Sequence, residues 1–382
     1  MPQNNKAIVM CVVGARPNFM KIAPVMAALR SGQSRLDAFL LHTGQHYDES
    51  MKSCFFDQLG IPVPDKDLEV GSGSHAVQTA DIMKKFEPVL DEIKPAMLLV
   101  VGDVNSTIAC ALVAVKKGIP VVHVEAGLRS YDRNMPEEVN RVLTDQISDM
   151  HFLTEKSARE NLLREGIADN KIHFVGNVMI DTLKANLAKA VPTEQILADI
   201  ANKDLFLKSD TGYGVLTLHR PSNVDNPEIL ERLLATLNDI SKTLPLVFPV
   251  HPRTAQKITD AGCAGYLNTD RILQLNPLAY HEMLGLNSKA RLVLTDSGGI
   301  QEETTALGVP CITLRENTER PITVDEGTNT VVGTDPARVR AAFDDVMQTG
   351  GKVGKSPELW DGKAAIRIVA VMEKWLKDNN KL

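Results

Sequence analysis

The chain has 382 residues, of which 43% are hydrophobic and 24% are charged, and its formal net charge is -6. This length exceeds what one hydrophobic core usually serves, so we expect two domains. The modest negative charge excludes electrostatic attraction to nucleic acid or to an anionic membrane, and no stretch reaches the ~18 apolar residues of a membrane span. Residues 1–6 lack the pattern of a secretion signal, so we expect a cytoplasmic protein with no nucleic-acid or membrane partner.

The five cysteines lie far apart and include no Cys-x-x-Cys pair. This spacing predicts neither a disulfide framework nor a cysteine metal site. Cys11, Cys110 and Cys311 fall inside apolar runs, so we interpret them as buried small hydrophobic residues.

Short β-branched runs alternate with longer amphipathic segments along the first half of the chain. This alternation is typical of parallel strands joined by crossover helices, and runs that are apolar throughout indicate a sheet covered on both faces. The predicted strands are Ala7–Val13, Asp37–His42, Ala96–Val101, Pro120–Val124, Met150–Leu153 and Lys171–Phe174. The predicted helices include Lys21–Arg30, Ala76–Ile93, Ser106–Lys117, Pro136–Ile147 and Ser157–Arg164.

A polar stretch from about Ala188 to Gly214 has no strand pattern and marks the domain junction. The predicted strands beyond it are Tyr213–Leu218, Leu246–Val250, Arg271–Leu275, Leu292–Thr295 and Pro310–Thr313. We therefore predict an α/β protein of two Rossmann-like, doubly wound domains. The first spans 1–185 and is completed by a C-terminal helix at 360–382, and the second spans 186–359. The loops after the strands of both sheets would line one central cleft, so functional residues should follow strands directly.

Charged residues follow several strands of the first half. Arg16 and Lys21 come after the first strand, where they could meet phosphate oxygens or simply be solvated surface charges. Asp103 follows the third apolar run, and Glu125 leaves the fourth, where a buried carboxylate would be costly without a partner or a task. Glu137 stands at the start of the next predicted helix, where pairing with the helix dipole is the simpler explanation.

In the second half, Ser297, Gly298 and Gly299 join a strand to a helix. Glycines let backbone N–H groups approach an anion, and a helix N-terminus favours phosphate, although a tight turn capped by Ser297 gives the same pattern. His219 and His251 also follow strands, which favours contact with a ligand. The histidines lack the paired spacing of a metal site, so we predict no metal.

The candidate residues combine acids, histidines and a phosphate turn. Such a set suits abstraction and return of a carbon-bound proton on a bound sugar, but it is equally compatible with glycosyl transfer. The chain lacks a Gly-x-Gly-x-x-Gly fingerprint after its first strand, which argues against a nicotinamide or flavin cofactor.

In their order, these motifs resemble the family of non-hydrolysing UDP-N-acetylglucosamine 2-epimerases over nearly the whole chain. Each motif is weak alone, but the series is highly specific. The motifs are Gly14-x-Arg16-Pro17 with Lys21, Thr43-Gly44-Gln45-His46, Gly102-Asp103, His123-Val124-Glu125-Ala126-Gly127-Leu128-Arg129, Pro136-Glu137-Glu138-x-Asn140-Arg141, His219-Arg220 and Asp296-Ser297-Gly298-Gly299-x-Gln301-Glu302-Glu303.

The resemblance implies the two-domain GT-B architecture, a homodimer, and reversible conversion of UDP-N-acetylglucosamine to UDP-N-acetylmannosamine with no cofactor, supplying a precursor of surface polysaccharide. In the family's route the C2 proton is removed, UDP leaves to give a 2-acetamidoglucal, and UDP is re-added with protonation from the opposite face. Asp103, Glu125 and Glu137 match the catalytic carboxylates, with Asp103 as general base, and Lys21 and His219 match the other essential residues. The residues that we assign to substrate binding on this basis are Arg16, Gln45, His46, Arg220, His251, Ser297, Gly298, Gly299 and, for the ribose, Glu303.

The chain also departs from the family pattern. The segment Val70–Ala76 lacks the arginine of members that are activated by their own substrate, which argues against that regulation. Asn18 replaces a frequent glutamate, and together with residues 221–225 it could tune the sugar specificity, for example toward a UDP-2,3-diacetamido uronic acid. A GT-B glycosyltransferase, a hydrolysing relative and a non-catalytic sensor of nucleotide sugars stay open as alternatives.

Overall fold

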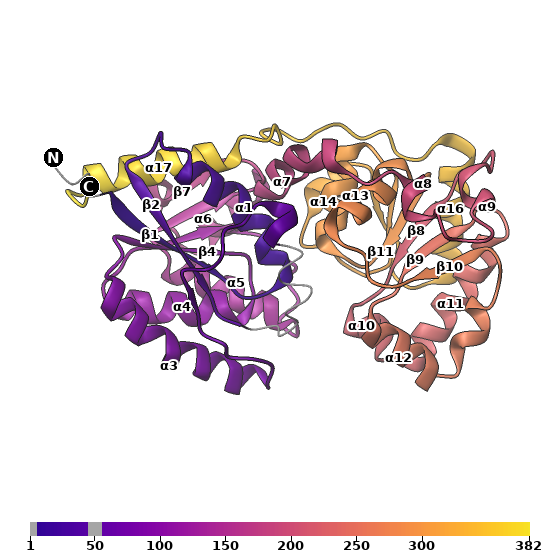
Figure 1. Ribbon diagram of the computed structural model, residues 1–382, viewed down its shortest axis with the longest axis horizontal. Coiled ribbons are helices and arrows are strands. Elements are labelled where there is room, and N and C mark those ends of the chain that lie inside the picture. The colour runs from indigo at the N-terminus through magenta and orange to yellow at the C-terminus, as the bar shows by residue number, and fades with distance from the viewer. Residues whose placement is uncertain (1–5, 45–55) are drawn as a thin grey trace. The chain divides into compact units, whose positions relative to one another are not determined.

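A computed structural model describes residues 6–44 and 56–382, which form two α/β units (Figure 1). Unit 1 comprises Met1–Ala185 and Glu358–Leu382, and unit 2 comprises Asn186–Pro357. Each unit contains a parallel sheet with crossover helices, so the predicted α/β, Rossmann-like fold class is confirmed. In the described part of the chain, no helix has the length and apolar character needed to cross a membrane.

The strands of unit 1 lie in the order β3-β2-β1-β4-β5-β6-β7 and pair in parallel. Their bounds are β1 (Ala7–Val13), β2 (Leu36–His42), β3 (Lys66–Asp67), β4 (Met97–Val101), β5 (Val121–Val124), β6 (Met150–Leu153) and β7 (Ile172–Phe174). The helices are α1 (Arg16–Arg30), α3 (His75–Ile93), α4 (Asn105–Lys116), α5 (Pro136–Ile147), α6 (Ser157–Arg164), α7 (Val178–Asn186) and α17 (Ala364–Asp378).

The strands of unit 2 lie in the order β10-β9-β8-β11-β12-β13 and are also parallel. Their bounds are β8 (Gly214–Thr217), β9 (Leu246–Pro249), β10 (Ile272–Leu275), β11 (Leu292–Thr295), β12 (Cys311–Thr313) and β13 (Asn329–Val331). The helices are α8 (Thr193–Ile196), α9 (Asp204–Leu207), α10 (Pro221–Val224), α11 (Pro227–Ser241), α12 (Pro252–Asp260), α13 (Tyr280–Lys289), α14 (Gly298–Leu307), α15 (Pro321–Asp325) and α16 (Pro336–Thr349).

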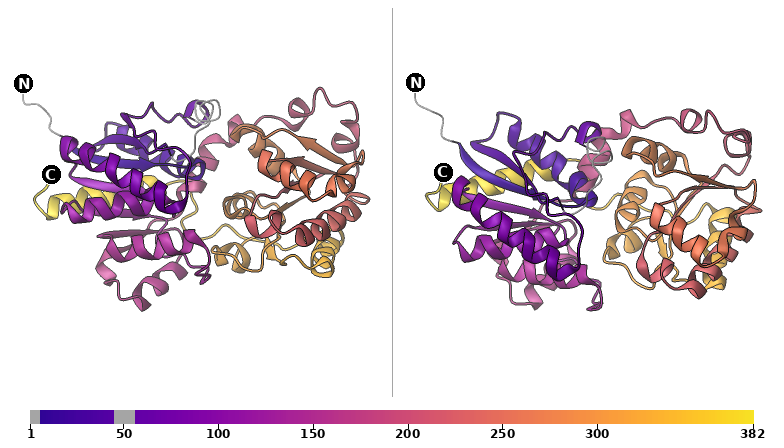
Figure 2. Two further views of the ribbon diagram at one scale, coloured as in Figure 1. Left: turned by 90° about the horizontal axis from the view of Figure 1, so that it is seen from below. Right: turned by 60° about the horizontal axis from the view of Figure 1, so that its bottom comes forward.

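Both faces of the unit 2 sheet are packed against helices (Figure 2). Along β11, Val293 packs into one apolar cluster with Val215, while Leu294 packs into the opposite cluster with Leu216. This explains why the strands are apolar at every position, since neither face of the sheet meets water. Strands β3 and β13 were missed in the sequence because they are short and carry polar residues at the sheet edges.

The three cysteines inside apolar runs are buried, as predicted. Burial raises the pKa of the Cys11 thiol to about 12 and that of Cys311 to about 11. Burial likewise raises the pKa of Cys110 above its ordinary value. Such thiols are protonated at neutral pH and are not nucleophiles.

The C-terminal helix α17 belongs to unit 1, where it packs along α1 (Figure 1, yellow). Its N-terminus has no side-chain cap of its own. Instead, the Asp181 carboxylate on α7 accepts hydrogen bonds from the backbone N–H groups of Ala364 (3.1 Å) and Ala365 (2.8 Å). The chain enters this position through a close approach at Gly176, where a Cβ would stand 2.1 Å from the Leu359 carbonyl. The Asp181 carboxylate therefore fixes the N-terminus of α17 against α7.

We expect Asp181→Ala to lower the free energy of unfolding of unit 1 by about 1–3 kcal/mol, because it leaves two buried N–H groups without an acceptor. Both tryptophans, Trp360 and Trp375, lie in the C-terminal segment of unit 1, so tryptophan fluorescence during urea unfolding reports on this unit. Asp361→Ala is the matched control, because Asp361 is exposed and pairs with Arg367 at the surface. An equal loss in both variants would contradict the capping role.

Candidate active site

In each unit, the sheet order reverses at one place. The chain moves outward from β1 to β2 and then returns to place β4 on the other side of β1, and β8 and β11 repeat this arrangement in unit 2. Ligands of open parallel sheets bind beyond the carboxyl ends of the strands at such reversals. Most candidate residues of the sequence stand after these four strands and after β5, whereas His251 follows β9 and Glu137 lies on α5.

A buried ion pair joins Lys21 on α1 to Glu125 after β5. The Lys21 Nζ atom lies 2.8 Å from the Glu125 carboxylate, and the two residues are only 6% and 3% exposed. Glu125 has a φ of 71°, in the left-handed region that residues with a side chain rarely adopt. The structure thus places two of the predicted catalytic residues in contact, and it holds the carboxylate in a strained backbone turn.

Asp103 follows β4, the neighbour of β5 in the sheet, and it forms an ion pair with Arg141 of α5. The preceding residue of that helix, Asn140, donates from Nδ2 to the backbone carbonyl of Asp103 at 2.9 Å. Glu137 is half-buried in the first turn of α5, four residues before Arg141 and on the same helix face. The α5 carboxylate that shares Arg141 with Asp103 is the neighbouring Glu138, at 2.5 Å.

Asn18 was predicted to tune the sugar specificity. In the structure, the polar atoms of its side chain form hydrogen bonds with the protein backbone. Its side-chain oxygen accepts from the backbone N–H of Ala15 at 3.1 Å, and its Nδ2 donates to the carbonyl of Val101 at 2.9 Å. Asn18 is 2% exposed. It braces the turn after β1 against the end of β4.

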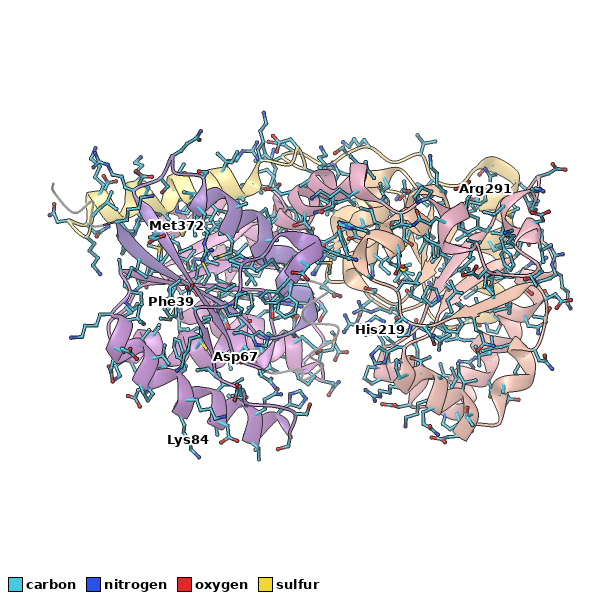
Figure 3. All side chains as sticks on the ribbon, viewed as in Figure 1. Phe39, Asp67, Lys84, His219, Arg291 and Met372 are labelled. Atoms are coloured by element: carbon cyan, nitrogen blue, oxygen red, sulfur yellow. The ribbon has the colours of Figure 1, made fainter. Side chains whose placement is uncertain are left out.

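In unit 2, Asp296 after β11 holds the loop after β8. Its carboxylate accepts the backbone N–H of Arg220 at 2.9 Å, the Nδ2 group of Asn223 at 3.2 Å and both the backbone N–H and the ring Nδ1 of His219, the latter at 2.8 Å. Burial raises the pKa of Asp296, but the hydrogen bonds and charge of His219 outweigh it and hold the pKa below its usual range. The His219 side chain is 46% exposed and is labelled in Figure 3. Its Nδ1 is fixed on Asp296, so the ring presents Nε2 outward.

Ser297 is the N-cap residue of α14, yet its side chain makes no capping hydrogen bond. The interpretation of this segment as a turn capped by Ser297 is therefore wrong. The hydroxyl group of Ser297 and the first N–H groups of the helix, at Gly298 and Gly299, form the type of donor set that suits an anion. Glu303 is buried in the next turn of the same helix, and burial together with this carboxylate raises the pKa of the neighbouring Tyr280 hydroxyl.

A buried cluster of charges packs behind this turn. A Cβ on Gly298 would stand 2.8 Å from the Glu319 carboxylate. Glu319 lies 2.9 Å from Arg315, 3.5 Å from Arg220 and 3.8 Å from Arg320, which is itself 3.0 Å from Glu302. Three guanidinium groups meet two carboxylates, so the formal charge of the cluster is +1. Burial and the neighbouring guanidinium groups lower the pKa of Arg315, although Glu319 opposes this shift.

The sequence analysis missed Arg315, Glu319 and Arg320. They lie in the loop after β12, and a position in the loop after a strand is the signal that selected most of the other candidates. Arg141 stood in a recognised motif but was not assigned to the site.

The remaining candidates are less informative. The Nδ1 atom of His251 accepts from the backbone N–H of Arg253 at 3.3 Å and so caps α12. Arg16 is the first residue of α1, and Gln45 and His46 lie outside the described residues. Within the described ranges, no three His, Cys, Asp or Glu side chains are grouped as a metal ion would require.

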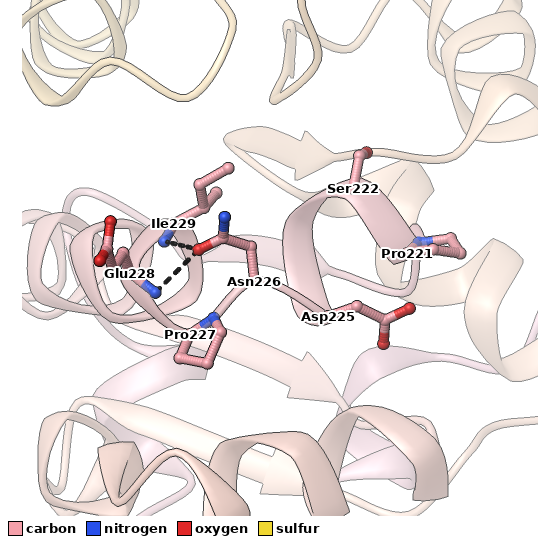
Figure 4. Close-up of a pocket in the computed structure, with 7 residues that line it drawn as sticks. All are labelled: Pro221, Ser222, Asp225, Asn226, Pro227, Glu228 and Ile229. Atoms are coloured by element: carbon pink, nitrogen blue, oxygen red, sulfur yellow. Dashed lines mark hydrogen bonds between the residues drawn. The ribbon is translucent and has the colours of Figure 1, made fainter. Parts of the chain in front are cut away.

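The loop beyond Arg220, the other proposed determinant of sugar specificity, forms α10 and borders a surface hollow (Figure 4). Asn226 in its wall accepts from the N–H groups of Glu228 and Ile229 and caps α11. Asp225 pairs with Arg253 at 2.6 Å. The side chains of Asp225 and Asn226 are therefore held by contacts within unit 2.

Comparisons with known proteins identify the family of the chain. A family model described as UDP-N-acetylglucosamine 2-epimerase matches residues 28–373. The chain belongs to the UDP-N-acetylglucosamine 2-epimerase family. The resemblance read from the motifs is therefore confirmed.

Two relatives and two solved structures show how similar the chain is to other members of this family. UDP-N-acetylglucosamine 2-epimerase of Methanococcus maripaludis is 44% identical over 88% of this chain and 91% of its own length. UDP-2,3-diacetamido-2,3-dideoxy-D-glucuronate 2-epimerase of Pseudomonas aeruginosa is 40% identical over 96% and 99%. The Methanocaldococcus jannaschii UDP-GlcNAc 2-epimerase, crystallised with UDP-GlcNAc and UDP, gives a TM-score of 0.85 at 41% identity and covers 96% and 99% of the two chains. S. aureus MnaA with UDP gives 0.85 at 30% identity, over 98% of each chain.

Removing the cation of the buried pair tests the electrostatics of the candidate site. We expect Lys21→Met to lower the free energy of unfolding of unit 1 by about 3 kcal/mol, because it leaves the Glu125 carboxylate buried without its lysine. The double variant Lys21→Met/Glu125→Gln should recover part of this loss.

The matched control is Lys117→Met, which removes a lysine from a surface cluster with Asp91 and Glu87. We expect it to change stability by less than about 1 kcal/mol. Equally small losses for Lys21→Met and Lys117→Met in urea unfolding, followed by tryptophan fluorescence, would show that the buried pair is no more important for stability than a surface pair.

Proposed function

We propose that the protein is a non-hydrolysing 2-epimerase that interconverts UDP-N-acetylglucosamine and UDP-N-acetylmannosamine. In the proposed route the C2 proton is removed, UDP leaves to give a 2-acetamidoglucal, and UDP is then re-added with protonation on the opposite face. Family membership and the relative crystallised with UDP-GlcNAc and UDP support this proposal.

The observation that carries the proposal is the pair of carboxylates, Asp103 and Glu125, at the ends of adjacent strands. Taking a proton from one face of C2 and returning one to the other needs two groups that exchange protons. We assign Asp103 as general base and Glu125 and Glu137 as partners in proton transfer. Lys21, held against Glu125, would stabilise the negative charge that develops when the C2 proton leaves.

We assign the nucleotide to unit 2. Ser297, Gly298 and Gly299 offer N–H groups and a hydroxyl to the diphosphate, and the charge cluster behind them carries a net positive charge that favours the anion. His219, with Nδ1 on Asp296, would donate from Nε2 to the departing UDP. We assign Glu303 to the ribose hydroxyls. The further substrate contacts in this proposal are Arg16, Arg220, His251, Gln45 and His46.

A second substrate is supported by one specific observation. The P. aeruginosa relative acts at C2 of a UDP-2,3-diacetamido uronic acid and matches this chain over almost its full length. The same acids and the same diphosphate turn would serve that reaction, since only substituents at C3 and C5 of the sugar differ. The identity of the sugar is therefore the part of the proposal that a substrate comparison must decide.

Solvent exchange at C2 tests the reaction. In deuterium oxide with UDP-N-acetylglucosamine, we expect deuterium at C2, an equilibrium mixture of both UDP-sugars and little free UDP, followed by NMR. Asp103→Asn should lower this exchange by more than about 100-fold, because it removes the proposed base. Turnover only of the diacetamido uronate would move the substrate and keep the mechanism.

Other outcomes would overturn the proposal. Accumulation of UDP and free sugar would indicate a hydrolysing enzyme, and turnover that requires an acceptor would indicate a glycosyltransferase. Absence of any conversion, with UDP-sugar binding intact, would indicate a sensor.

The turn at Gly298 gives a separate prediction. Gly298→Ala places a Cβ 2.8 Å from Glu319, a carboxylate that Arg315 holds at 2.9 Å and that cannot move away freely. We expect UDP to bind about 10-fold more weakly, as for the loss of one charged hydrogen bond, and free 2-acetamidoglucal to appear during turnover. Calorimetry with UDP and NMR of the reaction measure the two effects. Gly265→Ala is the control in the same unit, because nothing lies within 4 Å of its Cβ position.

A further inference from the structure

His123, in the centre of β5, is fully buried and uses both ring nitrogens. Its Nδ1 lies 2.7 Å from the Asp145 carboxylate, and its Nε2 lies 2.8 Å from the backbone carbonyl of Gly102. A carbonyl only accepts hydrogen bonds, and so does an ionised carboxylate. The other oxygen of Asp145 accepts a backbone N–H and pairs with the Arg129 guanidinium, so partners other than His123 also hold this carboxyl group ionised. The ring therefore donates from both nitrogens, as an imidazolium.

The carbonyl that His123 binds belongs to the turn that carries Asp103. Gly102 adopts a φ of 65°, its N–H donates to Val124 at 3.1 Å, and Lys21 Nζ lies 2.8 Å from the position a Cβ would occupy. A larger residue would displace the lysine. The bond from His123 fixes the Gly102 peptide group from the opposite direction, one residue before Asp103.

The counter-ion of His123 binds the other carboxylate turn. The second oxygen of Asp145 accepts from the backbone N–H of Gly127 at 3.1 Å and lies 2.8 Å from Arg129. Gly127 has a φ of 78° and stands two residues after Glu125, in the same turn. Asp145 is 0% exposed. The pair of His123 and Asp145 thus connects the turn of Asp103 to the turn of Glu125 through bonds to both backbones.

We propose that His123, as an imidazolium paired with Asp145, is a positioning residue that holds Asp103 and Glu125 in the relative orientation needed for proton transfer. This inference rests on the proposed epimerase function. His123 and Asp145 act through backbone groups and make no contact with substrate in this proposal. His123 divides its two donors between elements that carry different acids.

The charge of the ring also acts on the acids. His123 stands two residues before Glu125 in the sequence. Its ring is hydrogen-bonded to the backbone carbonyl of Gly102, the residue before Asp103. The titratable and charged groups that surround it, from the elements packed against β5, are Asp145, Arg129, His151, Asp103, Arg141, Lys21 and Glu125. Loss of a buried cation among them makes the acids harder to ionise.

Three variants test the proposal. His123→Gln can keep a donor toward Gly102, His123→Asn can keep a donor toward Asp145, and His151→Gln is the matched control. His151 is equally buried and pairs in register with His123 on β6. Its ring has one short bond, to the backbone carbonyl of Asp145 at 2.7 Å, while the carbonyl of Lys171 is 3.4 Å away, and burial lowers the pKa of His151. The three variants and the parent are compared in C2 deuterium exchange, in kcat and KM, and in UDP affinity.

We expect His123→Asn to lower kcat and C2 exchange about 10- to 100-fold, because it releases the peptide before Asp103, while KM and UDP affinity change little. His123→Gln should recover part of the rate. In both variants the acidic limb of the kcat/KM profile should move to higher pH, because the cation is lost. His151→Gln should lose stability to a similar degree but keep the parent rate and profile. Equal rates in all three variants, per folded molecule, would overturn the proposal.

A measurement without substrate separates this inference from the proposed function. In protein labelled with ¹⁵N-histidine, the signals lost in His123→Gln should show both ring nitrogens protonated, because each faces an acceptor. A neutral ring would overturn the inference whatever the substrate. A parent protein that exchanges no C2 proton on either UDP-sugar, but contains the doubly protonated ring, would overturn the proposed function instead.

Discussion

A charged side chain at the buried end of a parallel strand needs a partner of opposite charge, because burying it alone costs several kcal/mol. This constraint organises both units. In unit 1, Glu125 is held by Lys21 and Asp103 by Arg141. In unit 2, the carboxylate of Asp296 is held by the histidine ring and backbone of the loop after β8. Each pair ties the end of one strand to a helix or to a loop from another strand, and so sets the geometry of the candidate site.

Such pairs are poor devices for stability. Two charges lose their hydration on burial, and a well-packed apolar substitute is often as stable or more so. Glu125 adds backbone strain through its φ of 71°. The pairs instead provide orientation, because a carboxylate that is fixed by a cation and by backbone bonds can adopt few rotamers. Charge burial and backbone strain both oppose folding. They are concentrated at the carboxylates that the proposed chemistry needs in a fixed orientation.

Much of the fold could be predicted from the sequence, because apolar runs such as Met97–Val101 mark strands covered on both faces. The acids of the site could also be found, since they follow those runs. Their partners could not. Asp145 sits late in an amphipathic helix, where a carboxylate usually faces solvent, and Asp296 meets His219 across 77 positions. Mixed charges such as those after β12 are equally typical of a solvated loop, so only the tertiary structure reveals their burial.

The proposed elimination would divide the required charges between its two ends. A leaving diphosphate gains negative charge, so cations belong with the nucleotide, while the carbon that loses a proton needs acids. Glu319 at first conflicts with this division, because it packs directly against Gly298 in the proposed diphosphate turn. Its three arginine neighbours resolve the conflict. A carboxylate among three guanidinium groups screens their mutual repulsion and lets them share one small buried volume, where they would otherwise separate. The acid therefore makes the positive site possible, and it explains why a glycine must stand in front of it.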